Sequence, residues 1–506
     1  MLSAPQVRSL PLLLAVLLLP ACATVRPDVN AQMAGVSPVS EDWQASLPAG
    51  VSQNADASVS ESHSLAGWWQ QLNDPLLNQL VTLTLVNNPD MATAALNHRL
   101  ALLQLGIAGT DNIPDVRASV SGGRSGTSDS MSNSASAGLS ASWEVDLWGT
   151  MSSEEKSARA GVDQAVAELR DAQVSLIAQT ASAYTSLRLA QQNIRVATAS
   201  IGLRQESYDL ARASWQAGLG TELDVMQAKT LLEQSRANLP QYQQARSEAI
   251  NQLRVLAGGE LNSLLPSLQA DAELPALPQQ LALSLPAETL RQRPDVKANE
   301  YALIAQGEAV VQAHNQRFPT FTLTGNLSSS GTNMADVFSA DSLVRSIAAS
   351  ISYSLFDSGV LKTNERTQQL KFEQALQTYR TSLLTAQQEV EDALSTLDAA
   401  QQQQTSYQQA EASAQLAEEL ARMQYDAGML DFNDLLDAQS DLLSARNNRV
   451  QNDGALLSDW IQLYRVAGGG WQALADANNA PDAAHNKTDK KTQNHTQETA
   501  GGQKQI

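Results

Sequence analysis

The residues with the clearest chemical role lie in a twelve-residue segment that occurs twice, as AGLGTELDVMQA at 217–228 and as AGMLDFNDLLDA at 427–438. Gly218 and Gly428 can each end a helix, because glycine readily adopts the left-handed conformation that follows a helix C-terminus. Three residues after each glycine, Thr221 in the first copy and Asp431 in the second can cap a new helix with their side chains. Asp224, three residues after Thr221, completes a capping box. Each copy therefore predicts an elbow, a turn that ends one helix and starts the next.

The second elbow carries an additional acid. Asp434 is equivalent to Asp224 and has the same potential use as a capping acid. Asp437 lies one turn further into the helix, where capping no longer applies, and its equivalent in the first elbow is Gln227. Asp437 is therefore the better candidate for a functional carboxylate. The alternative is an acid on a solvated helix face.

The sequence offers no set of residues suited to catalysis. There is no nucleophile–base–acid constellation, phosphate-binding loop or metal-ligand spacing, and the five histidines are scattered. The single cysteine excludes an intramolecular disulfide and a cysteine-based zinc site. A formal net charge of −20 disfavours binding to nucleic acid. We therefore predict a protein that is not an enzyme, holds no metal or cofactor and does not bind nucleic acid.

The N-terminus predicts export and lipidation. Arg8 precedes a short apolar run, residues 10–19, which is typical of a secretory signal and too short to span a bilayer. The run ends at Cys22 in a segment that resembles a bacterial lipoprotein box, in which cleavage precedes a cysteine that becomes lipidated. By the same resemblance, Ala23 at the next position favours the outer membrane. We expect a covalent lipid on Cys22; a plain signal peptide with an incidental cysteine is the alternative.

Two stretches alternate between apolar and small polar residues, which is the pattern of a β-strand with one apolar face. They are 134–146 and 346–355, and a weaker strand precedes each, at 117–124 and 319–328. A transmembrane strand needs roughly 9–11 residues with one apolar face, so we favour membrane strands over a sheet packed on helices. Four strands cannot close a barrel and lipid does not tolerate open edges. Several copies must then share one barrel, and a cyclic homotrimer supplies twelve strands.

Helical patterns fill most of the remaining chain. Apolar residues recur every seven positions from Gly149 to about residue 217, and again over about 360–427, as in a coiled-coil seam. Shorter helices should follow the elbows, at about 221–256 and 431–467. Because these features repeat at offsets of 205 to 210 residues, the body of the chain is a duplicated domain. Such hairpins from three copies would form a cylinder, whereas a solvated coiled coil would enclose nothing.

Three motifs carry a family resemblance. The segment LPAETLRQRPDV at 285–296, the segment WWQQLNDP at 68–75 and the second elbow, from Tyr425 to Gln439, resemble the signatures of the outer-membrane factor family (TolC/OprM-like). The motifs occur in the family's order, and the lipoprotein box resembles that of its lipoprotein branch.

The resemblance implies a mainly α fold with a membrane β part. A homotrimer would build a twelve-stranded transmembrane barrel and a helical barrel that extends into the periplasm. The protein would be lipid-anchored in the outer membrane and act as the passive exit duct of a tripartite efflux pump. It would dock to a periplasmic adaptor and an inner-membrane transporter and export small molecules such as drugs. A protein-secretion duct of the same fold and a coiled-coil lipoprotein without a pore are the alternatives.

The resemblance also implies roles for residues of the elbows. Asp434 and Asp437 match an acidic ring that lines the periplasmic mouth in the family, and Tyr425 matches a tyrosine that helps to hold the mouth shut. The family's locking arginine is absent, because Leu430 stands in its place. Contact with the adaptor is implied for a set of residues in both elbows: Gly218, Thr221, Asp224 and Gly428.

The predicted boundaries follow the chain in order: signal peptide 1–21, lipidated tether 22–66, first repeat 67–262 with strands at about 115–147, connector 263–285, second repeat 286–470 with strands at about 318–357, and a disordered polar tail 471–506.

Overall fold

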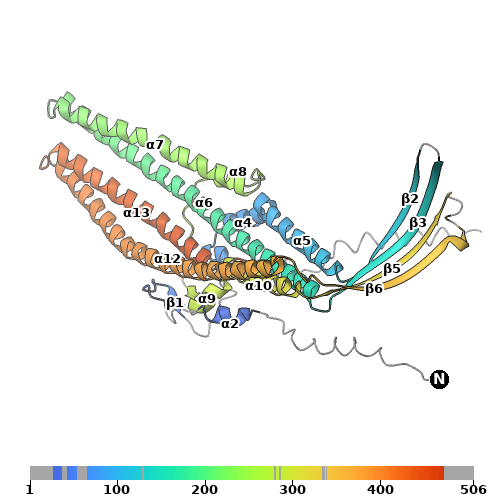
Figure 1. Ribbon diagram of the computed structural model, residues 1–506. Helices are drawn as coiled ribbons and strands as arrows, with labels where there is room; N and C mark the ends of the chain where they lie inside the picture. The colour runs from blue at the N-terminus through green and yellow to red at the C-terminus, as the bar shows by residue number, and fades with distance from the viewer. Residues whose placement is uncertain are drawn as a thin grey trace, which may run out of the picture. The chain divides into compact units, whose positions relative to one another are not determined.

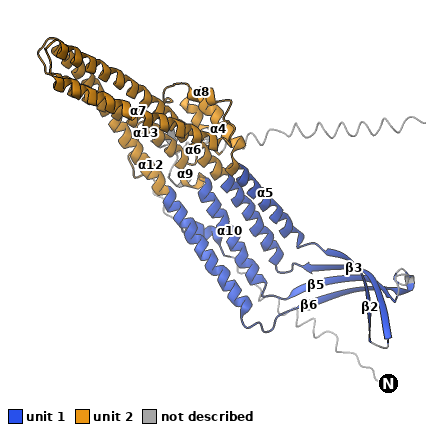
Figure 2. Cartoon of the chain, turned by 90° about the horizontal axis from the view of Figure 1, so that it is seen from above, with its two compact units in different colours: residues 1–39, 92–169, 294–386 blue, residues 40–91, 170–293, 387–506 orange. Residues whose placement is uncertain are grey.

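A computed structural model describes residues 27–36, 43–53, 65, 67–127, 130–277, 281–283, 286–332, 337 and 339–471. The predicted signal peptide, the lipidation site Cys22 and residues 472–506 of the predicted tail lie outside the described residues. The chain forms two compact units (Figure 2), unit 1 with residues 1–39, 92–169 and 294–386, and unit 2 with residues 40–91, 170–293 and 387–506.

Unit 1 contains an antiparallel four-stranded sheet in the order β2-β3-β5-β6 (Figure 1). The strands are β2 (Asp115–Thr127), β3 (Ser130–Val145), β5 (Thr320–Gly331) and β6 (Leu343–Ser352). The two predicted hairpins are confirmed, and β3 of the first pairs with β5 of the second. Within one chain, β2 and β6 each have a strand neighbour on one side only, so the sheet ends in two open edges.

The register gives the sheet one apolar and one polar face. Trp143 lies opposite Leu323, which lies opposite Ala349, whereas the next row is Glu144, Thr322 and Ser350. Every residue of β2 and of β6 is exposed, including large apolar side chains such as Val120 (68% exposed) and Ile347 (85% exposed). The apolar face of these edge strands is therefore not packed on the helices of its own chain.

The helices of unit 1 repeat the same pattern twice. Helix α5 (Pro89–Thr110) leads into the first hairpin and α10 (Pro294–Asn315) into the second, and each has 22 residues. After the hairpins come α6 (Thr150–Gln216) and α12 (Val360–Asp426), each of 67 residues. Both long helices contribute residues to both units. Unit 1 also holds the short helices α2 (Val29–Ala34) and η3 (Ala340–Ser342).

Unit 2 is mainly helical. The long helices continue into α7 (Glu222–Leu256) and α13 (Phe432–Val466), of 35 residues each, as predicted. Asp74 caps α4 (Pro75–Asn87) by accepting hydrogen bonds from the amides of Leu76 and Leu77, and Pro75 occupies the first helical position, where proline is favoured. In η2 (Trp68–Leu72), the buried Trp68 ring stacks on Tyr464 with centroids 5.0 Å apart. No helix among the described residues has the length and apolar character needed to cross a membrane.

The range predicted to be a plain tether contains ordered structure. Besides α2, strand β1 (Val51–Gln53) pairs in parallel with β4 (Leu281–Leu283). The backbone amides of Gln44 and Ala45 donate to the Glu391 carboxylate of α12, at 2.9 and 2.7 Å. The prediction was wrong for this part because polar composition does not reveal partners hundreds of residues away. Trp471, assigned to the tail, likewise lies under Arg170 at 4.4 Å.

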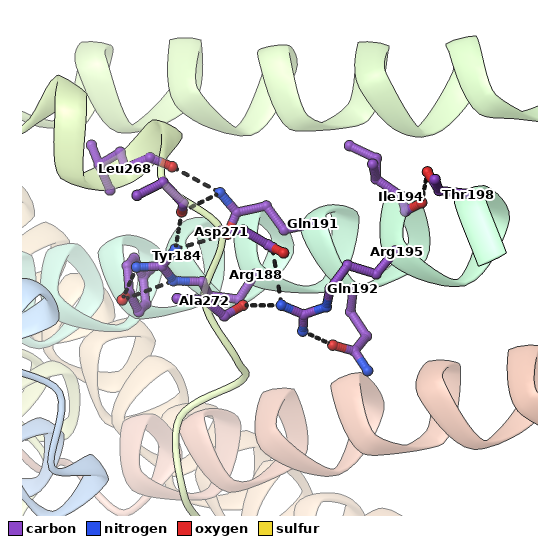
Figure 3. Close-up of polar contacts among 11 residues, drawn as sticks. Tyr184, Arg188, Gln191, Gln192, Ile194, Arg195, Thr198, Leu268, Asp271 and Ala272 are labelled. Carbon is purple, nitrogen blue, oxygen red and sulfur yellow. Dashed lines mark hydrogen bonds and ion pairs between the residues drawn. The ribbon is translucent and has the colours of Figure 1, made fainter.

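The connector between the repeats is held along α6 by a row of polar side chains (Figure 3). It contains the helix α8 (Leu265–Gln269) and is followed directly by α9 (Pro286–Gln292). Arg188 and Gln191 donate to the carbonyl of Ala270, and Arg195 forms an ion pair with Asp271 at 3.0 Å. Arg188 also donates to the hydroxyl of Tyr184, which in turn donates to Asp74. Burial and the hydrogen bond to Asp74 raise the pKa of Tyr184.

Candidate functional site

Both elbows lie in unit 2, where each joins a long helix to the shorter helix that returns beside it (Figure 1). Gly218 and Gly428 have φ of +73° and +70°, the left-handed region that favours glycine. The amide of the next residue bonds back five positions in each elbow, Leu219 to Ser214 and Met429 to Gln424, both at 2.8 Å. Each elbow is therefore a Schellman motif, and the predicted helix ends are confirmed.

The two elbows start their second helices in different ways. In the first, Thr221 Oγ1 accepts from the Asp224 amide and Asp224 Oδ2 accepts from the Thr221 amide, so the predicted capping box is present. In the second, the Asp431 side chain makes no capping hydrogen bond, and the capping use expected for Asp434 is wrong. Phe432 is buried there instead, so apolar packing fixes the start of α13.

The apolar side chains behind the elbows form one cluster, which we call the elbow cluster. It joins the two hairpins of one chain and contains the buried residues Ala211, Val225, Ala228, Phe432, Leu435 and Leu436. Tyr425 packs against it half-buried, with its ring 5.5 Å from that of Phe432. The tyrosine that the family resemblance assigns to the closed mouth thus also supports the fold of its own elbow.

Asp434 and Asp437 are both exposed on the first turns of α13. Among the described residues, no hydrogen bond or ion pair involves the Asp434 carboxylate. No contact within the described part of the chain therefore accounts for an acidic residue at this position. The negative charge of Asp437 acts on Arg204 of α6: burial lowers the pKa of the guanidinium and the Asp437 charge opposes that shift. The structure therefore leaves both acids facing solvent at the elbow.

A layer of polar residues lies beside the elbow cluster and was not predicted. We call it the polar layer; it consists of the buried Arg204, Ser207, Glu418 and Gln439 and the half-buried Ser440. Arg204, 3% exposed, donates to Ser440 Oγ at 2.7 Å and, with longer bonds of 3.4 Å, to the Leu436 carbonyl and Gln439 Oε1. The Gln439 amide nitrogen donates to Glu418 at 3.5 Å. One amide therefore accepts from a buried cation and donates to a buried carboxylate.

The polar layer holds the turn of α13 that carries Asp437. The bonds of Arg204 end on residues 436, 439 and 440, on either side of that acid. The sequence contains a sign of the polar layer, because the two copies of the repeat differ at its positions. Arg204 corresponds to Ala414, Glu418 to Tyr208 and Gln439 to Lys229. A comparison of the two copies could therefore have identified Arg204 and Glu418 as charged residues that only one copy carries.

The tips of the elbows present apolar side chains to solvent. Leu219 is 86% exposed and Met429 is 73% exposed, and Leu223 follows at 63%. Gly218, Gly428 and Thr221 are also exposed, while Asp224 is half-buried in its capping box. The residues predicted to meet a partner are thus accessible, except that Asp224 is occupied in capping. In the described part of the chain, no three His, Cys, Asp or Glu side chains converge on a potential metal position.

Comparison with known proteins agrees with this architecture. The family model for "Outer membrane efflux protein" matches residues 80–259 and 285–469. The pyoverdine export outer membrane protein OpmQ of Pseudomonas aeruginosa is 30% identical over 480 residues, which cover 92% of this chain and 98% of OpmQ. The antibiotic efflux pump outer membrane protein ArpC of Pseudomonas putida is 29% identical over 455 residues, 88% of this chain and 92% of ArpC.

Solved structures give the same result. The outer-membrane channel OprN has a TM-score of 0.77 and 31% identity, over 86% of this chain and 100% of OprN. The open state of the Neisseria gonorrhoeae MtrE outer membrane channel has a TM-score of 0.74 and 26% identity, over 89% and 99%. This chain therefore belongs to the outer membrane efflux protein family, whose members are channels and not enzymes.

Proposed function

We propose that the chain is the outer-membrane exit duct of a tripartite efflux pump and works as a homotrimer. The observation that carries this proposal is the four-stranded sheet with two open edges and an exposed apolar face. Open backbone edges are not stable in lipid, so β2 of one copy must pair with β6 of the next. Three copies supply twelve strands, enough to leave a lumen, with the apolar face towards lipid and the hydroxyl-rich face inside.

The elbows form the gate of this duct. Three copies bring six carboxylates, Asp434 and Asp437 of each chain, around one axis. Two unit charges 4 Å apart interact by about 1 kcal/mol in water and by more where the dielectric is lower, so the ring attracts cations. Tyr425 and the elbow cluster set how closely the second hairpins approach the axis. The exposed acids with few competing contacts support this role.

The elbow tips are the docking surface for a periplasmic adaptor, which links the duct to an inner-membrane transporter. Their exposed Leu219, Leu223 and Met429 have no described cover within the chain, and exposed apolar side chains beside a polar rim are typical of interaction sites. The glycine turns at residues 218 and 428 let the partner approach the backbone closely.

The cargo is a small molecule and the anchor is a lipid on Cys22. Two relatives are named for antibiotic efflux and for pyoverdine export, which favours small molecules over a secreted protein. The N-terminal apolar run ending at Cys22 supports lipidation and attachment to the outer membrane. The energy for export comes from the partner transporter, because members of the family are channels and not enzymes.

The proposal is tested by reconstituting the purified protein in a planar bilayer and recording single channels. We expect discrete, cation-selective steps, and reduced cation selectivity for the double variant Asp434→Asn/Asp437→Asn. Glu248→Gln is the matched control, since Glu248 is an exposed acid of α7 that lies ~40 Å along that helix from the elbow. Selectivity unchanged in the double variant would remove the acids from the gate. A correctly inserted protein that is silent with and without the substitutions would favour a coiled-coil lipoprotein without a pore.

A further inference from the structure

The charged residues of the four-stranded sheet are sorted by face. The register places Arg124 of β2 and Arg345 of β6 on the apolar face, where the strands carry no acidic residue. Both arginines are exposed, and neither forms a hydrogen bond or ion pair within the described part of the chain. The polar face carries both signs, with Asp115, Arg117 and Glu144, and Arg117 pairs with Asp115 at 2.6 Å. The apolar face therefore holds cations that the sheet itself does not neutralise.

Both arginines lie towards the hairpin ends of their strands, and the helices of unit 1 join the opposite ends (Figure 1). Arg345 is the third residue of β6, and Tyr353, directly after β6, is eight residues further along. Eight residues span ~27 Å of strand, or about 20 Å of membrane thickness at a tilt of roughly 40°. The apolar band of such a barrel is about 25 Å tall and flanked by aromatic residues. With Tyr353 at the periplasmic boundary, Arg345 lies near the outer boundary.

An apolar trough lies beside Arg345 on the same face, with a volume of ≈ 570 Å³. Two successive rows of the register line it: Val116, Ala141, Gly325 and Ile347 in one row, and Leu139, Leu327 and Arg345 in the next row towards the hairpin ends. Ala141 and Gly325 are small and adjacent, so they form a low floor between larger side chains. A Cβ added at Gly325 would meet only the Cβ of Ala141, at 3.9 Å.

This combination suits an amphiphile with an apolar tail and an anionic head. The trough offers only apolar surface to a tail, and its volume lies within the range of roughly 300–1,000 Å³ that is typical of ligand sites. An arginine on the lipid-facing side of a barrel is destabilising unless its head reaches the interface, and its apolar stem can lie along the sheet while it does so. The guanidinium can then bind a phosphate with two parallel hydrogen bonds.

We propose that this face is a binding site for a phosphate-bearing lipid of the outer leaflet. One acyl chain lies in the trough over Ala141 and Gly325, and the headgroup phosphate accepts hydrogen bonds from Arg345. Each copy of the chain carries one such site. The inference rests on the proposed membrane channel, because it needs the sheet to lie in lipid with its hairpins outward. It adds a specific lipid ligand to what would otherwise be a general lipid-facing surface.

The test measures lipid binding to the full-length protein by native mass spectrometry, after exchange into a mild detergent has removed the lipid that copurifies. The probes are lipid A, whose headgroup carries phosphate, and the same lipid after enzymatic dephosphorylation. We expect lipid A to bind with up to one molecule per copy and the dephosphorylated lipid to bind about tenfold more weakly, since the charge-assisted hydrogen bonds are lost.

Two variants separate the headgroup from the tail, each with a matched control. Arg345→Gln should weaken lipid A binding about tenfold and leave binding of the dephosphorylated lipid unchanged. Its control is Arg117→Gln, an exposed arginine on the polar face, which should bind like the unsubstituted protein. Gly325→Leu fills the trough and should weaken binding of both lipids. Its control is Gly122→Leu, which adds the same bulk to the apolar face outside the trough, with the nearest atom to the new Cβ also at 3.9 Å.

The outcomes separate this inference from the proposed function. Selective loss in Arg345→Gln and Gly325→Leu, with both controls unaffected, supports the site. Equal binding of the two lipids, or lipid A binding that is unchanged in Arg345→Gln or in Gly325→Leu, overturns the site, and channels recorded from the same preparation leave the proposed function standing. A protein that binds neither lipid, has the native mass of one copy and gives no channels overturns both.

Discussion

Replacing Arg204 tests whether the polar layer positions the acidic turn of α13. Arg204→Met keeps the length and apolar stem of the side chain and removes its charge and donors. The change deletes the 2.7 Å bond to Ser440 and the longer bonds to Leu436 and Gln439. It also leaves the buried Glu418 bonded to an amide that no longer has a cation on its other side.

The expected size of the effect follows from these contacts. A hydrogen bond from a charged group contributes about 1.5–3 kcal/mol, and breaking a buried charged network from one side costs about 3–5 kcal/mol. Because two of the three bonds are long, we expect a value at the low end, about 3 kcal/mol. That corresponds to a change of roughly a hundredfold in the equilibrium for local opening.

Hydrogen exchange measured by mass spectrometry gives the assay, since local opening governs amide exchange. Peptides covering residues 432–442 should exchange roughly a hundredfold faster in Arg204→Met. The control is Arg212→Met, the same replacement at an exposed arginine of α6, with a change within about 0.5 kcal/mol. Adding Glu418→Gln to Arg204→Met should recover part of the loss, because it removes the unpaired buried charge. Exchange in Arg204→Met no faster than in Arg212→Met would refute a positioning role for the polar layer.

Two further predictions concern helix starts. Thr221→Ala removes a formed capping box and should destabilise the first turn of α7 by about 1 kcal/mol, whereas Asp431→Ala removes no capping bond and should destabilise the first turn of α13 by much less. Hydrogen exchange of the two first turns measures both effects, and equal effects would contradict the difference between the elbows. The second concerns Asp357, which accepts hydrogen bonds from the amides of Leu361 and Gly359; these bonds lower its pKa below 3.8. A carboxylate whose pKa is lowered by folding stabilises the folded state above its unfolded-state pKa, and this stabilisation is lost as the pH falls through the folded-state pKa. Thermal stability should therefore drop below about pH 4, and it should drop by less in Asp357→Asn. Identical pH profiles for the unsubstituted protein and Asp357→Asn would count against this cap.

Local patterns predicted the elements of this fold closely. Glycine positions placed the elbows, alternation placed β3 and β6, and the seven-residue spacing placed α6 and α12, because each of these signals depends on residues near one another in the chain. The capping box at Thr221 and Asp224 was likewise predictable, since its partners are three residues apart.

Features that depend on distant residues were missed. The same capping pattern at Asp431 and Asp434 gave a wrong expectation because Phe432 is buried against Tyr425 and α6 residues in the elbow cluster. The polar layer joins residues 204 and 439, and the order of the N-terminal segment depends on Glu391 of α12. The acids Asp434 and Asp437 could be named from the sequence, but only the structure shows that Asp434 is free of the capping role.

Single-channel recording in a planar bilayer decides whether this chain is a gated exit duct. We expect discrete, cation-selective conductance steps from the purified full-length protein, with cation selectivity reduced by Asp434→Asn/Asp437→Asn and retained in Glu248→Gln. Protein that inserts correctly as a trimer yet passes no current, with or without the acids, would contradict the proposal that this chain is an exit duct gated at its elbows.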